Sequence, residues 1–188
     1  MPLVVMLHGC TQSADDFARG TGMNRLADEL GFIVAYPAQS ASANAQKCWN
    51  WFRPGDQRRD QGEPALIAAV TREIIAERRI DPARVYIAGL SAGGAAAAVM
   101  GDAYPDLYAA VGIHSGLACG AARDLPSALM AMKNGGAAAP GRHARFTPVI
   151  TFHGDRDATV HEANSRRIIA MASAAAGAPL TSKVDKGR

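Results

Sequence analysis

The chain has 188 residues, of which 48% are hydrophobic, with charges of both signs and a formal net charge of +3. This composition excludes a disordered chain and a basic surface built for nucleic acid, and no apolar run reaches the roughly 20 residues of a membrane span. We therefore expect one soluble domain over residues 1–188, with neither nucleic acid nor membrane as partner, that buries about 70% of its unfolded surface. The sequence leaves the oligomeric state open.

Short apolar runs and helical patterns alternate along the chain. Each run is continuous and bounded by Gly, Pro or polar residues, which predicts strands buried on both faces. The predicted strands are residues 3–7, 32–36, 85–88, 110–114 and 149–152, and the predicted helices are residues 23–30, 64–79, 92–104 and 161–175. Strands that alternate with helices indicate an α/β fold with a mostly parallel central sheet flanked by helices.

Two long polar segments interrupt this alternation. Residues 37–64 carry both tryptophans, and residues 133–148 are rich in Gly and Pro. Long loops in compact domains often carry function. The rings of Trp49, Trp51 and Phe52 would either stack on a phenolic, sugar or aryl substrate or anchor the loop to the core, and both interpretations stay open.

The sequence Gly89-Leu90-Ser91-Ala92-Gly93 joins a predicted strand to a predicted helix. A serine in such a turn is pushed into the open at the C-terminal edge of the sheet, while small neighbours let the helix pack closely behind it. The first turn of that helix directs the Ala92 N–H toward developing negative charge. Ser91 is therefore the candidate nucleophile, and Ala92 is a candidate oxyanion donor.

Two further strand ends supply candidate partners for Ser91. Residues 7–12 read LHGCTQ, where the backbone N–H of Cys10 or of Thr11 is placed to be the second oxyanion donor. The strand at 149–152 is followed by Asp155 and Asp157, either of which would hold a catalytic imidazole in its tautomer. We prefer Asp157, because Asp155 has the position of a turn-forming residue.

The three cysteines, Cys10, Cys48 and Cys119, match no close-spaced metal pattern. Their spacing is compatible with one disulfide and a third thiol outside it, or with three buried thiols. The sequence does not choose between these states.

Taken together, several motifs resemble the α/β-hydrolase superfamily and, within it, the esterases related to polyhydroxybutyrate depolymerases, feruloyl esterases and acetyl xylan esterases. The motifs are LHGCTQ at 7–12, CWNWF at 48–52, DPARVYIAGLSAGG at 81–94, YPDLYAAVGIHSG at 104–116 and HGDRDATV at 153–160. The resemblance implies a secreted serine esterase that uses Ser91, Asp157 and a histidine, without metal or organic cofactor. It also implies a disulfide between Cys10 and Cys48.

The histidine of this triad has no evident position in the sequence. In this superfamily the order is Ser, Asp, His, and only His161 follows Asp157, four residues later at the start of a predicted helix. The other four histidines are more easily interpreted as structural; they are His8, His114, His143 and His153. We therefore expect the domain to be truncated here, with the catalytic histidine beyond Arg188.

These features predict hydrolysis of carboxylic esters, either small or polymeric, through an acyl-enzyme on Ser91. The ester itself is not identified: short acyl, feruloyl, acetyl and polyester substrates all fit. Two alternatives remain, namely a serine peptidase of the same fold and a hydrolase-like scaffold that binds sugars or polymers without turnover.

Overall fold

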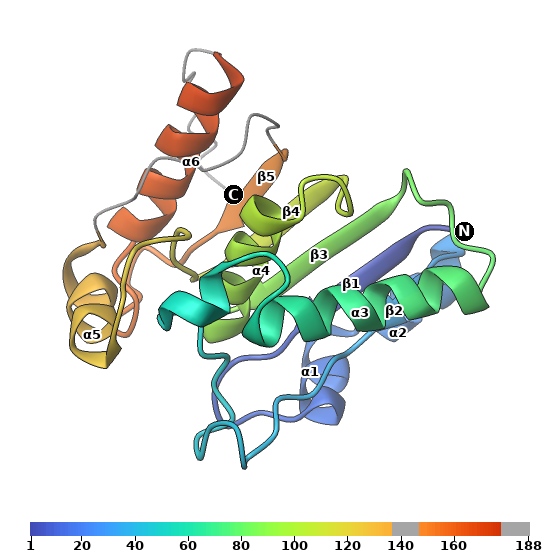
Figure 1. Cartoon of the computed structure of the whole chain (residues 1–188), viewed down its shortest axis with the longest axis horizontal. Helices are drawn as coiled ribbons and strands as arrows, with labels where there is room; N and C mark the ends of the chain where they lie inside the picture. The colour runs from blue at the N-terminus through green and yellow to red at the C-terminus, as the bar shows by residue number, and fades with distance from the viewer. Residues whose placement is uncertain (137–146, 178–188) are drawn as a thin grey trace, which may run out of the picture.

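The computed structural model describes residues 1–136 and 147–177. In this part of the chain a single sheet of five parallel strands has the order β2-β1-β3-β4-β5 (Figure 1). The strands are β1 (Leu3–Leu7), β2 (Ile33–Ala35), β3 (Val85–Leu90), β4 (Ala110–His114) and β5 (Val149–Phe152). The predicted α/β fold with a parallel central sheet is confirmed.

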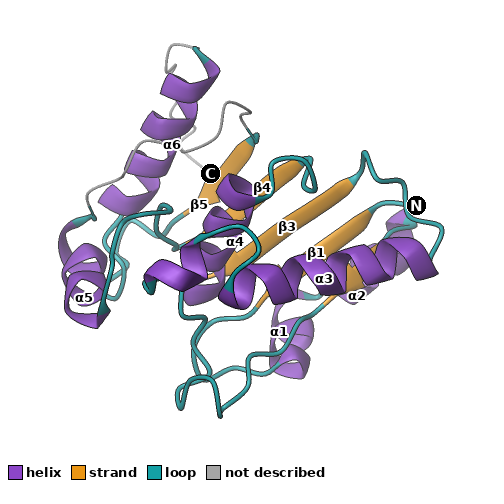
Figure 2. Cartoon of the chain, viewed as in Figure 1, coloured by secondary structure: helices purple, strands orange, loops and turns teal. Residues whose placement is uncertain are grey.

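Helices connect consecutive strands and cover both faces of the sheet (Figures 1 and 2). Helices α3 and α4 lie on the side turned toward the viewer, and α2 lies behind β2. The helical segments are α1 (Ala14–Thr21), α2 (Met23–Leu30), a 3-10 turn η1 (Pro54–Gln57), α3 (Gly62–Glu77), α4 (Ala92–Ala103), α5 (Leu125–Asn134) and α6 (Ala163–Ala176).

Two short helices, α1 and α5, begin at capping boxes. The Ser13 hydroxyl accepts from the Asp16 N–H while the Asp16 carboxylate accepts from the Ser13 N–H, and Asp124 and Ser127 form the same reciprocal pair before α5. Such boxes satisfy two otherwise unpaired N–H groups at the start of a helix. Neither helix was predicted from the apolar pattern, and α5 extends into the segment at 133–148 that we expected to be a loop. Most of that segment lies outside the described residues.

Helix α4 packs against the middle of the sheet and forms the centre of the core. Its residues from Ala92 to Ala97 are all buried, and their small side chains allow close approach to β3 and β4. Alternate strand residues such as Val5, Ile87 and Ile113 point into this layer and are almost fully buried.

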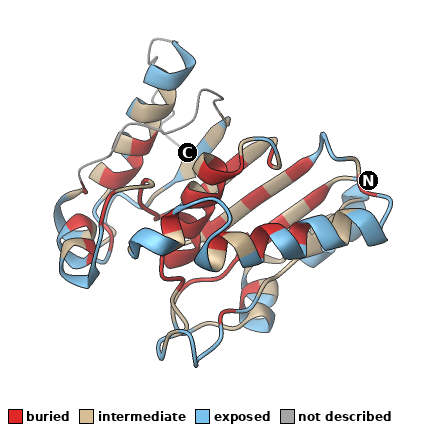
Figure 3. Cartoon of the chain, viewed as in Figure 1, coloured by how far each residue is buried: buried red, intermediate tan, exposed pale blue. Residues whose placement is uncertain are grey.

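The opposite face of β5 is open, which corrects the expectation that every strand is buried on both faces. Ile150 and Phe152 are 55% and 56% exposed, and β5 alternates between exposed and half-buried residues (Figure 3). The cause is the position of the helices: α2 packs against β2 and α1 packs against α2, so no described helix packs over this side of β5.

The strand register brings four loops to one edge. Leu7 pairs with Gly89, Leu90 pairs with His114, and His114 pairs with Phe152, so β1, β3, β4 and β5 end side by side. Ligands of open α/β sheets bind outside the carboxyl ends of the strands. Of the candidate site residues from the sequence, Cys10, Ser91, Ala92 and Asp157 follow the ends of these strands.

Candidate active site

Ser91 occupies a sharp turn between β3 and α4. Its backbone has φ 55° and ψ −119°, a conformation that residues other than Gly rarely adopt. The Ser91 N–H donates to His114 O at 2.9 Å, and Ser91 O accepts from Ala95 N, so the strained residue is held from both sides. This is the geometry of a nucleophile elbow, which presents the serine hydroxyl above the sheet.

The glycines at 89 and 93 are required by the close approach of backbone to backbone. A Cβ on Gly93 would lie 2.1 Å from Leu7 O and 2.5 Å from His8 O, and a Cβ on Gly89 would lie 2.3 Å from the Gly93 carbonyl. These contacts are far shorter than van der Waals distance, so the elbow can pack against β1 only with glycine at both positions.

The Ser91 hydroxyl is available for chemistry. Among residues 1–136 and 147–177 no side chain forms a hydrogen bond with it, and it does not cap α4. Behind it, the Ala92 N–H is one of the first-turn donors for which a helix has no acceptor of its own. The partial positive charge of the helix N-terminus therefore faces the position where an oxyanion would form.

The structure distinguishes between the N–H groups of Cys10 and Thr11, the two candidate oxyanion donors after β1. The Thr11 N–H is already donated to Gln46 O at 2.6 Å, whereas the Cys10 N–H has no acceptor in the part of the chain that the structure describes. Cys10 is therefore the better candidate for the second oxyanion donor, together with Ala92.

A disulfide joins Cys10 to Cys48 across a sequence separation of 38 residues, which confirms the predicted pairing. It ties the loop after β1 to the loop that carries the tryptophans. Cys119 lies outside this bond, with its Sγ 3.6 Å from the Asp102 carboxylate.

Asp157 is held in place after β5. Its Oδ1 accepts from the Thr159 and Val160 N–H groups, both at 2.9 Å. Burial raises the pKa of this carboxyl, but hydrogen bonds from the Val160 N–H and the Ser115 hydroxyl outweigh it, so the net pKa is lowered. Asp155 is exposed on the same turn. Of the two aspartates, Asp157 is therefore the one whose carboxylate is held in place by hydrogen bonds.

The rings of His8 and His153 are occupied by structural hydrogen bonds. His8 Nε2 accepts from the Gln39 N–H at 3.0 Å, so Nδ1 carries the proton and donates to Gly9 O at 2.7 Å. His153 Nε2 donates to Val160 O at 2.6 Å, and its Nδ1 accepts from the Ser165 hydroxyl. Neither ring has a nitrogen left to act as the base.

The positions of His114 and His161 do not indicate a catalytic role. His114 is exposed at the end of β4 with its ring centroid 6.5 Å from that of Phe152. His161 precedes α6, where its Nδ1 accepts from the Ala163 N–H at 3.2 Å. His143 lies outside the described residues.

Both tryptophans belong to the core. Trp49 is 4% exposed and Trp51 is 6% exposed; the Trp49 indole N–H donates to His8 O, and Trp51 packs edge-on against Phe52. This burial favours the anchoring interpretation, because a ring that stacks on substrate has to present a face to the site.

A cavity of about 430 Å³ opens on the sheet face opposite α4, beside the strand that leads into Ser91. Its lining is mostly apolar and includes Phe17 of α1, Leu90 of β3, His114 of β4 and Phe152 of β5. Its size falls within the range of small-molecule sites in proteins.

Two sets of residues at this edge were not found from the sequence. Ser115, directly after β4, bonds to Asp157; it lies in the motif at 104–116, of which only His114 was considered as a site residue. The second set is a polar cluster of the buried Gln39 and Asn50 with the half-buried Glu63, for which no local motif exists.

Neither a metal centre nor a membrane span is found in the described part of the chain. No group of three or more His, Cys, Asp or Glu side chains is arranged to hold a metal ion there. The helices of the described residues are too short or too polar to cross a bilayer.

Comparison with known proteins identifies the family. A poly(3-hydroxyalkanoate) depolymerase C of Paucimonas lemoignei is 38% identical over an alignment of 180 residues that covers 89% of this chain and 43% of that protein. A feruloyl esterase B of Thermothelomyces thermophilus is 34% identical over 128 residues, which are 68% of this chain and 43% of that protein. The chain thus spans less than half the length of these curated relatives.

An acetyl xylan esterase from Aspergillus awamori has the same fold, with a TM-score of 0.83, 22% sequence identity and coverage of 94% of this chain and 70% of that one. Residues 1–178 match the model of the family described as esterase PHB depolymerase. The chain therefore belongs to the esterase PHB depolymerase family and has the α/β-hydrolase fold.

Proposed function

We propose that the protein is a serine hydrolase of carboxylic esters. The observation that carries this proposal is the strained Ser91 at the elbow, with its hydroxyl unengaged and two N–H donors, those of Cys10 and Ala92, close in the fold. In the reaction, the Ser91 oxygen attacks the ester carbonyl, and the two amides stabilise the oxyanion. The base takes the Ser91 proton during the attack and gives it to the alcohol as the bond between the carbonyl carbon and the alcohol oxygen breaks. In the second half the base takes a proton from water, whose oxygen attacks the acyl-enzyme, and returns it to Ser91 as the acid leaves.

The base in this proposal is a histidine beyond Arg188, oriented by Asp157. Two observations support it: His8 and His153 use both ring nitrogens in structural bonds, and Asp157 is ordered while its second carboxylate oxygen lies 3.5 Å from His153 Nε2. The open side of β5 and the cavity beside it offer a place for such a segment to pack, since parallel sheets are normally covered on both faces.

The substrate class follows from the relatives. Their names refer to a poly(3-hydroxyalkanoate), to feruloyl esters and to acetylxylan, and each of these substrates contains a carboxylic ester. We propose an ester of this group, small or polymeric, as substrate. We also propose an extracellular location, because the disulfide between Cys10 and Cys48 persists in oxidising compartments.

The test is hydrolysis of p-nitrophenyl acetate by the full-length protein and by a Ser91→Ala variant. We expect the variant to lose at least about 10³-fold in kcat, because removal of the nucleophile leaves only binding and the oxyanion donors. Ser173→Ala, a change at a half-buried serine of α6, is the matched control and should retain activity. A Ser91→Ala protein as active as the parent would show that another group attacks the ester.

The same preparation distinguishes the two alternatives. A faster reaction on matched amide than on ester substrates would favour a peptidase. Binding of oligomeric ester or sugar with no turnover by the folded parent would favour a scaffold without catalysis.

A further inference from the structure

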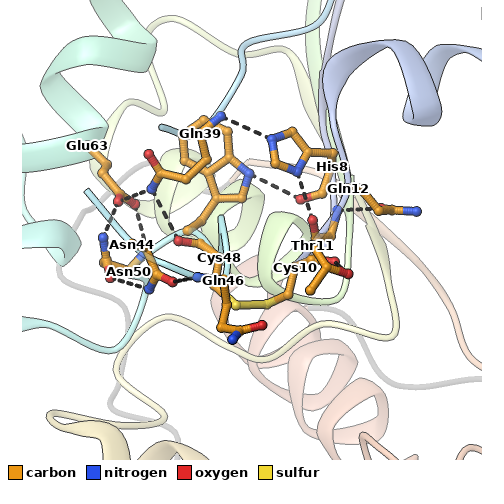
Figure 4. Close-up of a disulfide and its surroundings, with 12 residues drawn as sticks. His8, Cys10, Thr11, Gln12, Gln39, Asn44, Gln46, Cys48, Asn50 and Glu63 are labelled. Atoms are coloured by element: carbon orange, nitrogen blue, oxygen red, sulfur yellow. Dashed lines mark hydrogen bonds between the residues drawn. A yellow bond between two sulfur atoms is a disulfide. The ribbon is translucent and has the colours of Figure 1, made fainter. Parts of the chain in front are cut away.

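The polar cluster of Gln39, Asn50 and Glu63 has no part in the triad, yet it is connected to the candidate oxyanion site (Figure 4). We refer to residues 39–50 as the support loop and to residues 8–12 as the oxyanion loop. Figure 4 shows Glu63, from the start of α3, on one side of the support loop and the disulfide with the oxyanion loop on the other.

Glu63 accepts hydrogen bonds from both ends of the support loop. Its Oε1 accepts from the Gln39 amide and, at 2.6 Å, from the Asn50 amide, while its Oε2 accepts from the Asn50 backbone N–H at 2.7 Å. All three partners are donors. Gln39 and Asn50 are 9% and 2% exposed. Without the Glu63 carboxylate, their donor groups would therefore lose a hydrogen bond in a place that water reaches poorly.

From the support loop, four further connections reach the oxyanion loop. The Gln39 N–H donates to His8 Nε2, the Trp49 indole donates to His8 O, and Thr11 N donates to Gln46 O. The fourth connection is the disulfide from Cys48 to Cys10. Residue 10, whose N–H is the candidate oxyanion donor, is therefore fixed by contacts to a loop that Glu63 itself fixes.

The hydrogen bond that the Thr11 N–H donates to Gln46 O is part of this arrangement. Because Gln46 O takes the Thr11 N–H, the neighbouring Cys10 N–H is the one left to face the site, and a shift of the support loop would change which amide is available. An oxyanion donor has to be aligned with the position that the oxyanion occupies, and small displacements reduce its effect.

We propose that Glu63 is a positioning residue for the oxyanion site, acting through the support loop on the Cys10 N–H. This inference rests on the proposed ester hydrolysis. Glu63 touches neither substrate nor Ser91. Its carboxylate offers two acceptors to three donors, and in this way it sets the position of the loop that carries Gln46 and Cys48.

The central variant is Glu63→Gln, which keeps the shape but replaces one acceptor oxygen with an NH2 group. That group would face donors of Asn50 or Gln39, so the network cannot be satisfied. Glu73→Gln is the matched control, because Glu73 is an exposed glutamate on the same helix. Glu63→Asp, which retains both acceptor oxygens on a shorter side chain, should have a smaller effect and remains available if Glu63→Gln fails to fold.

Two quantities are measured on the full-length, oxidised proteins. The first is kcat and KM for p-nitrophenyl acetate; we expect kcat to fall about 10-fold in Glu63→Gln while KM changes less than about 3-fold, since oxyanion donors act on the transition state. The second is amide hydrogen exchange of a peptide covering residues 8–12, where exchange should accelerate about 10-fold as the Thr11 bond opens more often.

The outcomes separate this inference from the proposed function. Faster exchange with a lower kcat supports it, and unchanged exchange or unchanged kcat in a folded Glu63→Gln protein overturns it. A fall in kcat and an acceleration of exchange of the same size in Glu73→Gln would also overturn it. A folded parent without esterase activity overturns the proposed function, and exchange alone then decides whether Glu63 holds the oxyanion loop.

Discussion

The two sides of the candidate active site are built in different ways. On the β1 side, a disulfide, the half-buried Glu63 carboxylate and the ring of His8 fix the oxyanion loop before any substrate arrives. On the β5 side, within the described residues, Asp157 accepts hydrogen bonds from its own turn and from Ser115 and lies 3.5 Å from His153 Nε2, beside a strand with one open face. Covalent and polar constraints thus fix the loop of the proposed oxyanion donor, while the Asp157 carboxylate, which we propose orients the base, is held by hydrogen bonds.

Because of this difference, substitutions on the two sides should have different effects. Changes on the β1 side should affect stability and transition-state stabilisation together, because loop order and donor alignment depend on the same bonds. Changes at Asp157 should affect the rate far more than the fold.

The largest effect should come from the junction between the two sides, where α4 meets β1. Gly93→Ala would place a methyl group 2.1 Å from Leu7 O, with backbone on both sides of the contact. We expect loss of the folded protein, or a melting temperature lowered by more than 10 °C or so, since overpacking against backbone costs several kcal/mol. Circular dichroism melts of this variant and of Gly20→Ala, where the added Cβ meets nothing, provide the test.

The next effect concerns Asp157. Asp157→Asn keeps the size of the side chain but no longer stabilises an imidazolium or selects its tautomer, so kcat should fall by about 10³ to 10⁴. The melting temperature should change little by comparison. Asp155→Asn is the control and should keep near-parental kcat; the reverse pattern would make Asp155 the orienting residue.

The third effect concerns the disulfide. A Cys10→Ser, Cys48→Ser double variant should be less stable by about 3 to 4 kcal/mol, as expected for opening a loop of this length. Urea unfolding of the double variant against the oxidised parent measures this difference. A loss below about 1 kcal/mol would mean that the hydrogen bonds of residues 39–50 suffice to hold the β1 side.

The smallest effect is a pH dependence of opposite sign on the two sides. Burial raises the pKa of Glu63, whereas hydrogen bonds outweigh burial and lower that of Asp157. The Asp157 contribution to stability is therefore present above the unfolded value of about 3.9 and lost as the pH falls through the lower folded value. The Glu63 contribution is greatest below its unfolded value of about 4.3 and declines as the pH rises toward its higher folded value.

Urea unfolding between about pH 3 and pH 7 measures both signs. The stability difference between parent and Asp157→Asn should shrink toward low pH, and that between parent and Glu63→Gln should change in the opposite sense. Parallel curves for the two variants would contradict the assigned pKa directions.

The sequence predicted most of the fold because its signals are local. The bounds of β1, β4 and β5 agree with their apolar runs, and Ser91 lies in a five-residue motif whose glycines have a steric reason. Helices α1 and α5 were missed because their start signals are capping boxes in short segments without a long apolar period.

The rest of the site depends on contacts between distant residues. Glu63 and Gln39 are 24 residues apart, and Ser115 reaches a carboxylate more than forty positions away, so no spacing in the sequence reveals either pair. The burial of Trp49 and Trp51 was open for the same reason: a loop aromatic has the same sequence whether it faces substrate or core.

The central claim is that Ser91 is an activated nucleophile. Its most direct test is brief exposure of the full-length protein to a fluorophosphonate, followed by intact mass measurement and peptide mapping, with Ser91→Ala and Asp157→Asn run in parallel. The account predicts one adduct per parent chain, on Ser91, with none in Ser91→Ala and much slower labelling in Asp157→Asn. A folded parent that forms no adduct, or that forms it on another residue, would contradict the account.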